Sequence, residues 1–253
     1  MLTYRQNKIL EFVHKNGFCA VEELAQHLNT SAMTVRRDFI ALEKERLITR
    51  VHGGAIPVEN LLVSTHIASR INQHISEKRK IAAYAASIIE RDDTVFVDAG
   101  STCSYLAESF PENRSITVIT HSLNIINILK NKVGINIICT GGSFEEREGA
   151  FGGPITESCL SGFYVNKSFI GAAGISLEMG CASNNVNESK IKGVMHAHAR
   201  ESYILADASK FSSPAFHTFL PMEHTKNIIT DGSLSPAVMK QYKKAGVKII
   251  IAR

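Results

Sequence analysis

The stretch Ser31-Ala-Met-Thr-Val-Arg-Arg-Asp-Phe-Ile-Ala-Leu-Glu-Lys44 decides how the first part of this chain folds. On a helix of 3.6 residues per turn its apolar side chains form one stripe. The stripe consists of Ala32, Val35, Phe39 and Leu42. Arg37 falls opposite this stripe, with Met33 and Thr34 beside it and Arg36 on the flank. The pattern predicts a DNA recognition helix, although a solvated helix surface would carry charges in the same places.

The flanking sequence favours the recognition helix. An apolar helical pattern over residues 9–13 stops at Gly17, and a second short helix is predicted over residues 21–28. Two short helices joined by a tight turn, the second with an outward arginine, are typical of a helix-turn-helix. Residues 47–51 can form a strand, and Gly53-Gly54 permits a tight return, which predicts a wing.

The contacts expected with double-stranded DNA follow from this placement. Arg37 would read a base edge and Met33 a thymine methyl, whereas basic groups and the helix start would hold phosphates. The expected DNA-contacting residues are Ser31, Met33, Thr34, Arg36, Arg37, Arg50 and His52. Residues 1–56 contain eight Lys/Arg and six Asp/Glu, a balance of +2. The prediction therefore depends on where the arginines stand and not on bulk charge.

Residues 5–55 resemble the winged helix-turn-helix of the DeoR family of bacterial transcriptional regulators. The matching motifs are Ser31-x-x-Thr34-Val35-Arg36-Arg37-Asp38, Leu42-Glu43 and His52-Gly53-Gly54-Ala55. Phe39 stands where the family usually has Leu, and it keeps the apolar character. The similarity extends through nearly the whole chain.

Length and composition indicate two unequal domains in an ordinary globular protein. We expect a DNA-binding domain over residues 1–56, a linker over 57–76 and a larger domain over 77–253. The five cysteines are scattered and lack a C-x-x-C motif, which favours reduced thiols in the cytoplasm and no metal site. Neither a signal peptide nor an apolar run of membrane-spanning length is present, so no membrane contact is expected.

Short runs rich in Val and Ile alternate with helical stretches in the larger domain, which predicts a mostly parallel sheet covered on both faces. The runs are 94–98, 116–120, 135–140, 168–172, 203–207, 227–231 and 247–251. Polar or glycine residues stand at the ends of six of them: Asp98, Thr120, Thr140-Gly141-Gly142, Gly171, Asp207 and Asp231. In open α/β sheets ligands bind beyond the carboxyl ends of the strands, so these endings predict one crevice.

Within that crevice the stretch 98–104 is the best anion cradle, because a glycine and hydroxyls stand where a helix opens. An ordinary βα turn is the alternative. Gly141-Gly142 offers a second close-approach loop. The charged stretch Glu145–Glu148 after it is expected to be a solvated lid, from which Arg147 could close on a phosphate. Lys210 could pair with a phosphate or with Asp207, or could be a surface lysine.

The DeoR resemblance implies a fold similar to ribose-5-phosphate isomerases and a phosphorylated sugar as effector. The implied effector-binding residues are Asp98, Gly100, Ser101, Thr102, Thr120, Gly141, Gly142, Glu188, Asp207 and Lys210. His121 replaces a usual Asn and could alter ligand choice or pH response, although a structural role is the alternative. Cys103 stands where Thr is common, which puts one hydroxyl contact in doubt.

Together the motifs and the DeoR resemblance imply a repressor of a carbohydrate uptake or catabolism operon that a sugar phosphate releases from its operator. A dimer or tetramer is expected, with no cofactor, no metal and no catalytic residues. The alternative is a sugar-phosphate isomerase with an appended DNA-binding domain, in which Glu188, Asp207 and Lys210 supply acid, base and anion contact.

Overall fold

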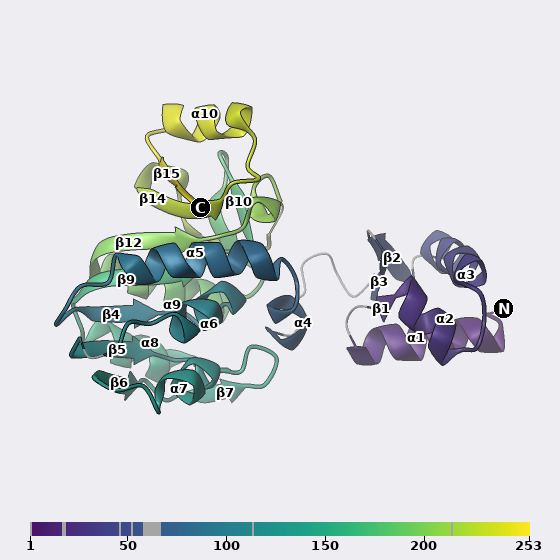
Figure 1. Ribbon diagram of the computed structural model, residues 1–253, viewed down its shortest axis with the longest axis horizontal. Coiled ribbons are helices and arrows are strands. Elements are labelled where there is room, and N and C mark those ends of the chain that lie inside the picture. Colours follow the sequence, from purple (N-terminus) through teal and green to yellow (C-terminus); the bar gives the residue numbers. More distant parts are fainter. Residues whose placement is uncertain are drawn as a thin grey trace. The chain divides into compact units, whose positions relative to one another are not determined.

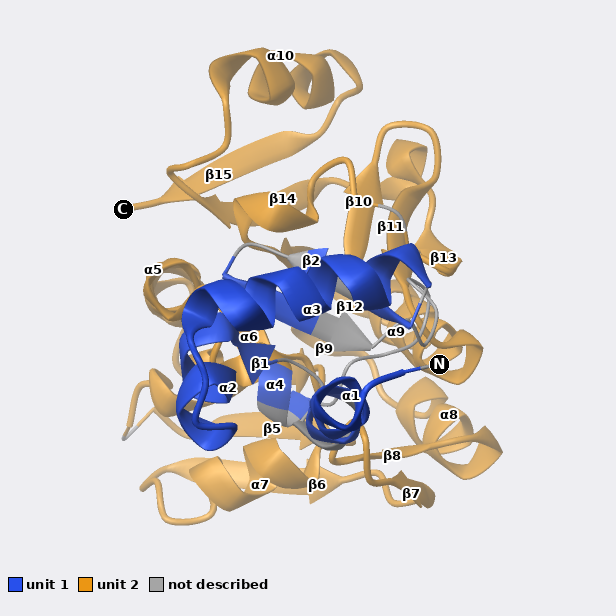
Figure 2. Cartoon of the chain, turned by 90° about the vertical axis from the view of Figure 1, so that its right-hand side faces the viewer, with its two compact units in different colours: residues 1–69 blue, residues 70–253 orange. Residues whose placement is uncertain are grey.

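The chain divides into two compact units, residues 1–69 and 70–253, coloured separately in Figure 2. The computed structural model describes residues 2–16, 19–45, 47–51, 53–57, 67–112, 114–213 and 215–253. Helix α4 (Ile67–Ile71) and the first residues of α5 (Ile75–Ser87) lie within the expected linker 57–76, so the second half of that stretch is helical. Among the described residues, no helix has the length and apolar character needed to cross a lipid bilayer.

Unit 1 has the elements of a winged helix-turn-helix (Figure 1). They are α1 (Tyr4–Asn16), β1 (Cys19–Ala20), α2 (Val21–His27), α3 (Ala32–Lys44), β2 (Ile48–Val51) and β3 (Gly54–Pro57). The three strands form an antiparallel sheet in the order β1-β3-β2. The three predicted helices and the wing are confirmed, whereas Gly17, the expected end of the first helix, lies outside the described residues.

The apolar stripe of α3 builds the core of unit 1. Val35, Phe39 and Leu42 are fully or almost fully buried against Ile9 and Leu24 of the two preceding helices. Gly53 at the wing return has a φ of +80°, a backbone conformation that favours glycine. The spacing of the apolar residues along α3 therefore determines which face of this helix is exposed.

Unit 2 is built on a seven-stranded sheet whose pairings are all parallel. In spatial order the strands are β15 (Lys248–Ala252), β14 (Asn227–Asp231), β12 (Ala199–Leu205), β9 (Val165–Gly171), β4 (Thr94–Val97), β5 (Ile116–Thr120) and β6 (Ile135–Cys139). Each of the seven predicted runs forms one of these strands. The strand order along the chain reverses between β4 and β9, and in doubly wound sheets such a switch point is where ligands bind.

Alternate residues of each strand face opposite sides of the sheet, and both sides are covered. Val95 and Val97 pack with α5, α6 (Ser101–Glu108) and α7 (Leu123–Leu129), whereas Phe96 packs on the other side. That second layer contains α8 (Pro154–Ser161), α9 (Val186–Ala197) and α10 (Pro236–Lys244). Burial on both faces explains why the strands are continuous apolar runs in the sequence.

Smaller elements surround the ends of the main strands (Figure 1). Strands β7 (Ser143–Glu145) and β8 (Ala150–Gly152) form an antiparallel hairpin after β6. A second sheet has the order β10-β11-β13, with bounds Gly174–Ser176, Gly180–Ser183 and His217–Leu220. Two short 3-10 helices complete the unit, η1 (Ala208–Lys210) and η2 (Met222–His224).

Candidate functional site

The outward face of α3 presents the side chains that the sequence analysis assigned to DNA. Ser31 caps the helix, its Oγ accepting from the backbone N–H of Thr34 at 3.2 Å. Met33 is 60% exposed, and Arg37 is exposed with no ion pair to any described residue. A free guanidinium and an exposed thioether therefore stand together opposite the buried stripe.

The other two arginines of this surface are held by carboxylates. Arg36 lies 3.4 Å from Glu22 of α2. Arg50 on β2 donates to Glu43 twice, from its backbone N–H at 3.1 Å and from Nε at 2.6 Å. A groove of about 480 Å³ between α3 and the wing is lined by side chains that include Met33, Arg36 and Arg50. His52, the remaining DNA-contact prediction, lies outside the described residues.

An ion pair that the sequence analysis missed joins α1 to α3. Asp38 is buried, and one of its carboxylate oxygens lies 2.5 Å from Nε of Arg5. Asp38 stands three residues after Val35 and four before Leu42, at the edge of the core stripe. That spacing was the available signal that this carboxylate faces inward. The pair fixes the first helix against the recognition helix.

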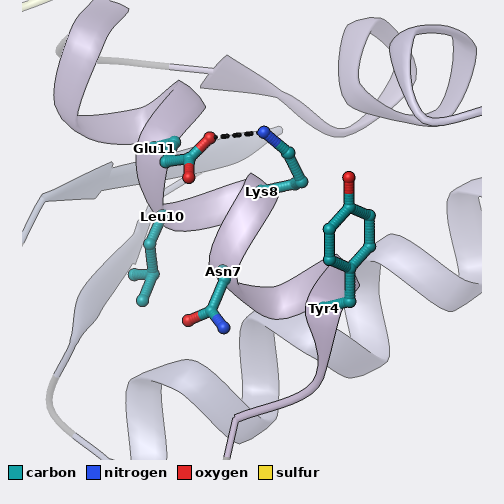
Figure 3. Close-up of a pocket in the computed structure, with 5 residues that line it drawn as sticks. All are labelled: Tyr4, Asn7, Lys8, Leu10 and Glu11. Atoms are coloured by element: carbon teal, nitrogen blue, oxygen red, sulfur yellow. Dashed lines mark hydrogen bonds and ion pairs between the residues drawn. The ribbon is translucent and has the colours of Figure 1, made fainter.

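Unit 1 also has a surface hollow on α1, shown in Figure 3. Its lining comes from one helix: Tyr4, Asn7, Leu10 and the ion pair of Lys8 with Glu11 at 2.8 Å. The ammonium of Lys8 lies 5.9 Å from the centre of the Tyr4 ring. Lys8 is therefore satisfied by residues about one helical turn away on either side, and we assign the hollow no functional role.

In unit 2, Asp98 stands directly after β4 at the switch point of the sheet. Its side chain is fully buried, and Oδ2 accepts from the backbone N–H of Gly171 at 2.9 Å. Gly171 ends β9, the strand on the other side of the switch. The predicted convergence of these two strand endings is therefore correct, and one carboxylate joins them.

Lys192 of α9 completes a buried charge cluster with Asp98. Its Nζ lies 3.0 Å from Oδ2 of Asp98 and 2.9 Å from Oε1 of Glu188, and it donates to the Gly171 carbonyl at 2.7 Å. Ser183 donates to the second oxygen of Glu188. We term Asp98, Glu188 and Lys192 the buried triad, in which Asp98 and Lys192 are buried and the Glu188 side chain is 12% exposed. The sequence analysis found the two carboxylates and missed the lysine between them.

The protonation states of the triad follow from its geometry. Burial opposes charge, but Lys192 outweighs it and lowers the pKa of both carboxyls, Asp98 and Glu188. Burial would lower the pKa of Lys192, yet the two carboxylates raise it above its ordinary value. The cluster therefore holds two negative charges and one positive charge at neutral pH.

His121, directly after β5, is buried beside this cluster. Its Nε2 lies 3.8 Å from Oδ1 of Asp98, and burial lowers the pKa of the imidazole despite that carboxylate. Both His121 Nδ1 and Asp98 Oδ1 are buried without a hydrogen-bond partner among the described residues. Buried polar atoms without partners are uncommon and mark candidate ligand contacts.

A small cavity of about 20 Å³ opens beside His121. Three carboxylate side chains, Glu145, Glu148 and Glu188, contribute to its lining. The hairpin β7–β8 also contributes Ala150, Phe151 and Gly152 to the lining. A volume of this size holds about one water molecule.

The structure corrects the expectation that the stretch Glu145–Glu148 is a solvated lid. Glu148 is buried, and its carboxylate forms an ion pair with Arg70 of α4. Burial raises the pKa of Glu148 even though Arg70 opposes the shift. Arg147 is exposed, as a surface arginine would be. The buried residue of this loop is therefore a carboxylate and not the arginine that was expected to close on a phosphate.

A group of cations lies near the end of β12. Lys78 of α5 is buried, and burial lowers the pKa of its ammonium to about 8. The charges of Asp207, Lys210, Arg70 and Glu77 also act on this pKa, Asp207 most strongly. Asp207 accepts from the backbone N–H of Ser209 at 3.0 Å, so it caps its own turn and forms no ion pair with Lys210 among the described residues. The sequence analysis missed Lys78.

The remaining predicted residues of the crevice have structural partners of their own. Gly100 is the N-cap of α6, and the next two residues, Ser101 and Thr102, are buried. The Thr120 hydroxyl donates to the Val97 carbonyl at 2.7 Å, which joins the ends of β4 and β5. Cys103 points into the core, its thiol 3.7 Å from the Phe169 carbonyl, so its lack of a ligand-facing hydroxyl has no consequence there.

Gly141 and Gly142 serve the turn after β6. The Gly141 carbonyl accepts from the Thr156 hydroxyl of α8 at 2.6 Å. A Cβ on Gly142 would lie 2.2 Å from that same hydroxyl oxygen, and its φ is +120°. Packing against α8 therefore requires glycine at position 142, whereas a Cβ on Gly141 would meet no atom within 4 Å. Both residues follow the edge strand of the sheet, away from the switch point.

Comparison with known proteins gives two family matches, one within each of the two compact units. Residues 5–60 match the model of the DeoR-like helix-turn-helix domain, and residues 73–232 match that of the DeoR C terminal sensor domain. The chain is 32% identical to the lactose phosphotransferase system repressor of Staphylococcus epidermidis, over 90% of this chain and 92% of that protein. It is 30% identical to the L-fucose operon activator of Haemophilus influenzae, over 99% and 100%.

Among solved structures, ribose 5 phosphate isomerase A of Neisseria gonorrhoeae aligns with a TM-score of 0.39 and 15% sequence identity. That alignment covers 54% of this chain and 53% of the isomerase.

Proposed function

Because the chain belongs to the DeoR family of helix-turn-helix transcriptional regulators, we propose that it represses a carbohydrate uptake or catabolism operon and that a phosphorylated sugar releases it from DNA. By name, one of the two relatives above is a lactose phosphotransferase system repressor and the other is an L-fucose operon activator. Of these two roles, repressor and activator, we propose that of a repressor. The observation that carries the sensor half is the buried triad at the switch point of the sheet.

On the DNA side we assign sequence reading to Arg37 and backbone contact to Arg50. Arg37 is exposed, opposite the buried stripe, and without an ion pair to any described residue, so it is free to donate to a guanine edge. Arg50 and Arg36 are paired with carboxylates that a phosphate would have to replace. Ser31 at the helix start places backbone amides toward a phosphate. We propose a homo-oligomer that places two such helices on a repeated operator.

On the sensor side we assign the sugar hydroxyls to the carboxylate-lined cavity. Ionised carboxylates accept hydrogen bonds and donate none, so Glu145 and Glu188 suit hydroxyl groups and repel a phosphate. The unpartnered atoms, Asp98 Oδ1 and His121 Nδ1, would gain a hydrogen bond from the same hydroxyls. His121 would therefore contribute to ligand specificity.

The phosphate is assigned to the cations near the end of β12. Lys78 is buried and Lys210 is half-buried there. An anion between these two groups would offset the desolvation that lowers the pKa of Lys78. Ser101 and Thr102, at the start of α6, are the proposed hydroxyl donors to the same phosphate.

The size of the cavity supports a ligand-dependent change of shape. At about 20 Å³ it cannot admit a phosphorylated sugar unless the hairpin β7–β8 moves outward. A ligand shifts a protein between two states only through its different affinity for them. A sugar phosphate that fits the open state alone would therefore favour that state.

The isomerase alternative lacks a joined catalytic set in this structure. Glu188 pairs with Lys192 and Asp207 caps its own turn, so the described residues do not form the acid, base and anion contact as one group. We therefore propose a regulator without catalytic turnover. A sustained isomerisation of ribose 5-phosphate by the purified protein would contradict this.

The proposal is tested by thermal shift and operator binding with a panel of phosphorylated and free sugars. One phosphorylated sugar should stabilise the protein, by roughly 2.7 kcal/mol at 100 times its Kd, and lower its affinity for operator DNA. Ser101→Ala and Lys210→Ala should keep operator binding and weaken the response to that sugar. Loss of operator binding in both variants would show a folding role for these residues and contradict the assignment.

A further inference from the structure

The end of α4 is held by three contacts, and each comes from a different element of the effector site. Lys78 of α5 donates to the backbone carbonyl of Arg70. Tyr105 of α6 donates through its hydroxyl to the carbonyl of Ile71 at 3.0 Å. Glu148, in the loop of the β7–β8 hairpin, pairs with the Arg70 side chain. We term these three contacts the α4 clamp.

The position of α4 in the chain gives the clamp its significance. The boundary between the two compact units falls within this helix, between residues 69 and 70 (Figure 2). The α4 clamp is therefore the point at which the chain passes from unit 2 to the DNA-binding unit. A five-residue helix has too few internal hydrogen bonds to be stable alone. Its order depends on the contacts that hold it.

We propose that effector binding opens the α4 clamp and thereby releases the chain segment that tethers the DNA-binding unit. This inference rests on the proposed effector site and names how that site is read out. Two of the three contacts, those of Lys78 and Glu148, compete directly with the ligand or with the movement that admits it. The clamp is closed when the site is empty and open when the site is filled.

Lys78 is the first point of competition. The Lys78 ammonium is buried and donates a hydrogen bond to the Arg70 carbonyl. A phosphate is an acceptor of opposite charge, so the Lys78 ammonium binds it more strongly than it binds a neutral carbonyl. The ammonium therefore turns from Arg70 to the ligand.

The hairpin is the second point of competition. Glu148 lines the cavity that must widen for a sugar to enter, and the same carboxylate holds the Arg70 side chain. An outward movement of the hairpin separates this pair. The Arg70 side chain has little else to hold it in place, because its buried Nε has no hydrogen-bond partner among the described residues. Only the Tyr105 contact then remains.

Release of α4 weakens DNA binding through geometry. An oligomeric repressor gains affinity because its second DNA-binding unit is held near the second half of the operator. A longer free tether lowers the effective concentration of that second unit. The recognition helix itself is unchanged, so contact with one half-site is retained.

The clamp is tested with Tyr105→Phe, which removes one hydrogen bond and does not touch the cavity lining. Operator DNA is first selected by the wild-type protein from random sequence, so no knowledge of the regulated genes is required. The variant should bind this DNA about two- to fivefold more weakly without any effector, from the loss of one hydrogen bond. By reciprocity it should bind the active sugar phosphate more tightly by a similar factor.

Tyr164→Phe is the matched control, since Tyr164 is 83% exposed and forms no hydrogen bond in the described part of the chain. It should behave as the wild type in both measurements. A variant with a folding defect would bind both operator DNA and effector more weakly. Tighter effector binding therefore distinguishes an opened clamp from a folding defect. Equal operator affinity of Tyr105→Phe and wild type would overturn the inference, and so would weaker effector binding by Tyr105→Phe.

Failure of the clamp and failure of the proposed function give different results. If no sugar phosphate in the panel releases the wild-type protein, the proposed effector is wrong, whereas the effector-free operator measurement still reports on the clamp. If a sugar phosphate releases the wild type and Tyr105→Phe alike, with equal thresholds, the effector is right and the clamp is wrong. Hydrogen exchange over residues 67–71 should rise on binding when both are right.

Discussion

The Nζ atom of Lys192 lies 3.0 Å from Oδ2 of Asp98, although the two residues are 94 positions apart and both are buried. This ion pair joins α9 to the end of β4 at the switch point of the sheet. Lys192 also pairs with Glu188, so one cation serves two carboxylates, one of them fully buried and the other largely enclosed. The site is therefore built around a charge that cannot be removed without leaving two others unpaired.

Lys192→Met should destabilise unit 2 by about 3–5 kcal/mol, because it leaves two carboxylates buried without their counter-ion. Lys190→Met, on the same helix and exposed, should change the free energy of unfolding by less than about 0.5 kcal/mol. Urea denaturation followed by circular dichroism measures both. Equal stability of the two variants would show that the triad is not a stabilising unit.

The pH dependence of stability should contain a contribution from His121. Burial lowers the pKa of this imidazole in the folded protein, whereas the unfolded chain binds the proton below about pH 6.5. The unfolded state then holds more protons, so stability falls as the pH drops through that value, by up to about 1.4 kcal/mol per pH unit.

His121→Asn should remove this contribution, and unfolding at pH 7.5 and 5.5 measures it. His224→Asn, at an exposed histidine, should keep the wild-type dependence. The lowered pKa values of Asp98 and Glu188 act in a separate window, since their stabilisation is lost only at more acidic pH. Identical pH profiles for wild type and His121→Asn would contradict the assignment.

Much of the fold could be predicted from the sequence because it depends on local periodicity. The period of 3.6 placed the stripe of Val35 and Phe39 correctly, and the continuous apolar runs gave all seven parallel strands. The switch point required the strand order, which the sequence does not display. Asp98 and Gly171 could be identified as strand endings, but their hydrogen bond could not.

The candidate site was harder to predict, because burial of a charge is decided by partners far along the chain. Lys192 and Lys78 resemble surface lysines in sequence, and only the fold encloses them. Glu148 stands in a charged loop that resembles a solvated lid. Thr120 and Gly142 were predicted as effector contacts, whereas in the structure Thr120 joins the ends of β4 and β5 and Gly142 packs against α8. The ligand contacts assigned to the crevice stay predictions.

Effector affinity should fall as the pH rises above about 8. The pKa of Lys78 is lowered to about 8 by burial, and a phosphate binds its protonated form. Above that pH the site must take up a proton on binding, which weakens affinity by up to tenfold per pH unit. Isothermal titration with the active sugar phosphate at pH 7, 8 and 9 measures this.

Lys78→Met should bind the sugar phosphate weakly at every pH and without this dependence. Lys80→Met, on the exposed side of the same helix, should follow the wild type. A wild-type affinity that is constant from pH 7 to 9 would place the phosphate elsewhere.

Arg37→Ala should lower operator affinity by about 1–3 kcal/mol and relax preference at one base position. The guanidinium is exposed and unpaired within the described chain, so its loss removes a DNA contact without removing an internal one. Binding to a set of single-base operator variants measures the effect. Arg91→Ala in unit 2, at an arginine whose side chain is 74% exposed, is the control. Full discrimination at every position in Arg37→Ala would contradict the orientation of α3.

Arg50→Ala should weaken binding to operator and unrelated DNA alike. A phosphate contact carries no sequence information, and its loss reduces the slope of log affinity against log salt by about 1. Titrations between about 50 and 200 mM salt give that slope. Unlike Arg37→Ala, this variant should keep the wild-type ratio of specific to non-specific affinity. A change in that ratio would mean that the wing reads bases.

The central claim is that one chain joins an operator-binding unit to a sugar-phosphate sensor. Fluorescence anisotropy of labelled operator DNA, titrated with the full-length protein with and without a sugar phosphate that stabilises it, tests this most directly. The account predicts that the ligand weakens operator affinity by about 5- to 150-fold, the usual range of allosteric coupling. Unchanged affinity in the presence of saturating, demonstrably bound ligand would contradict it.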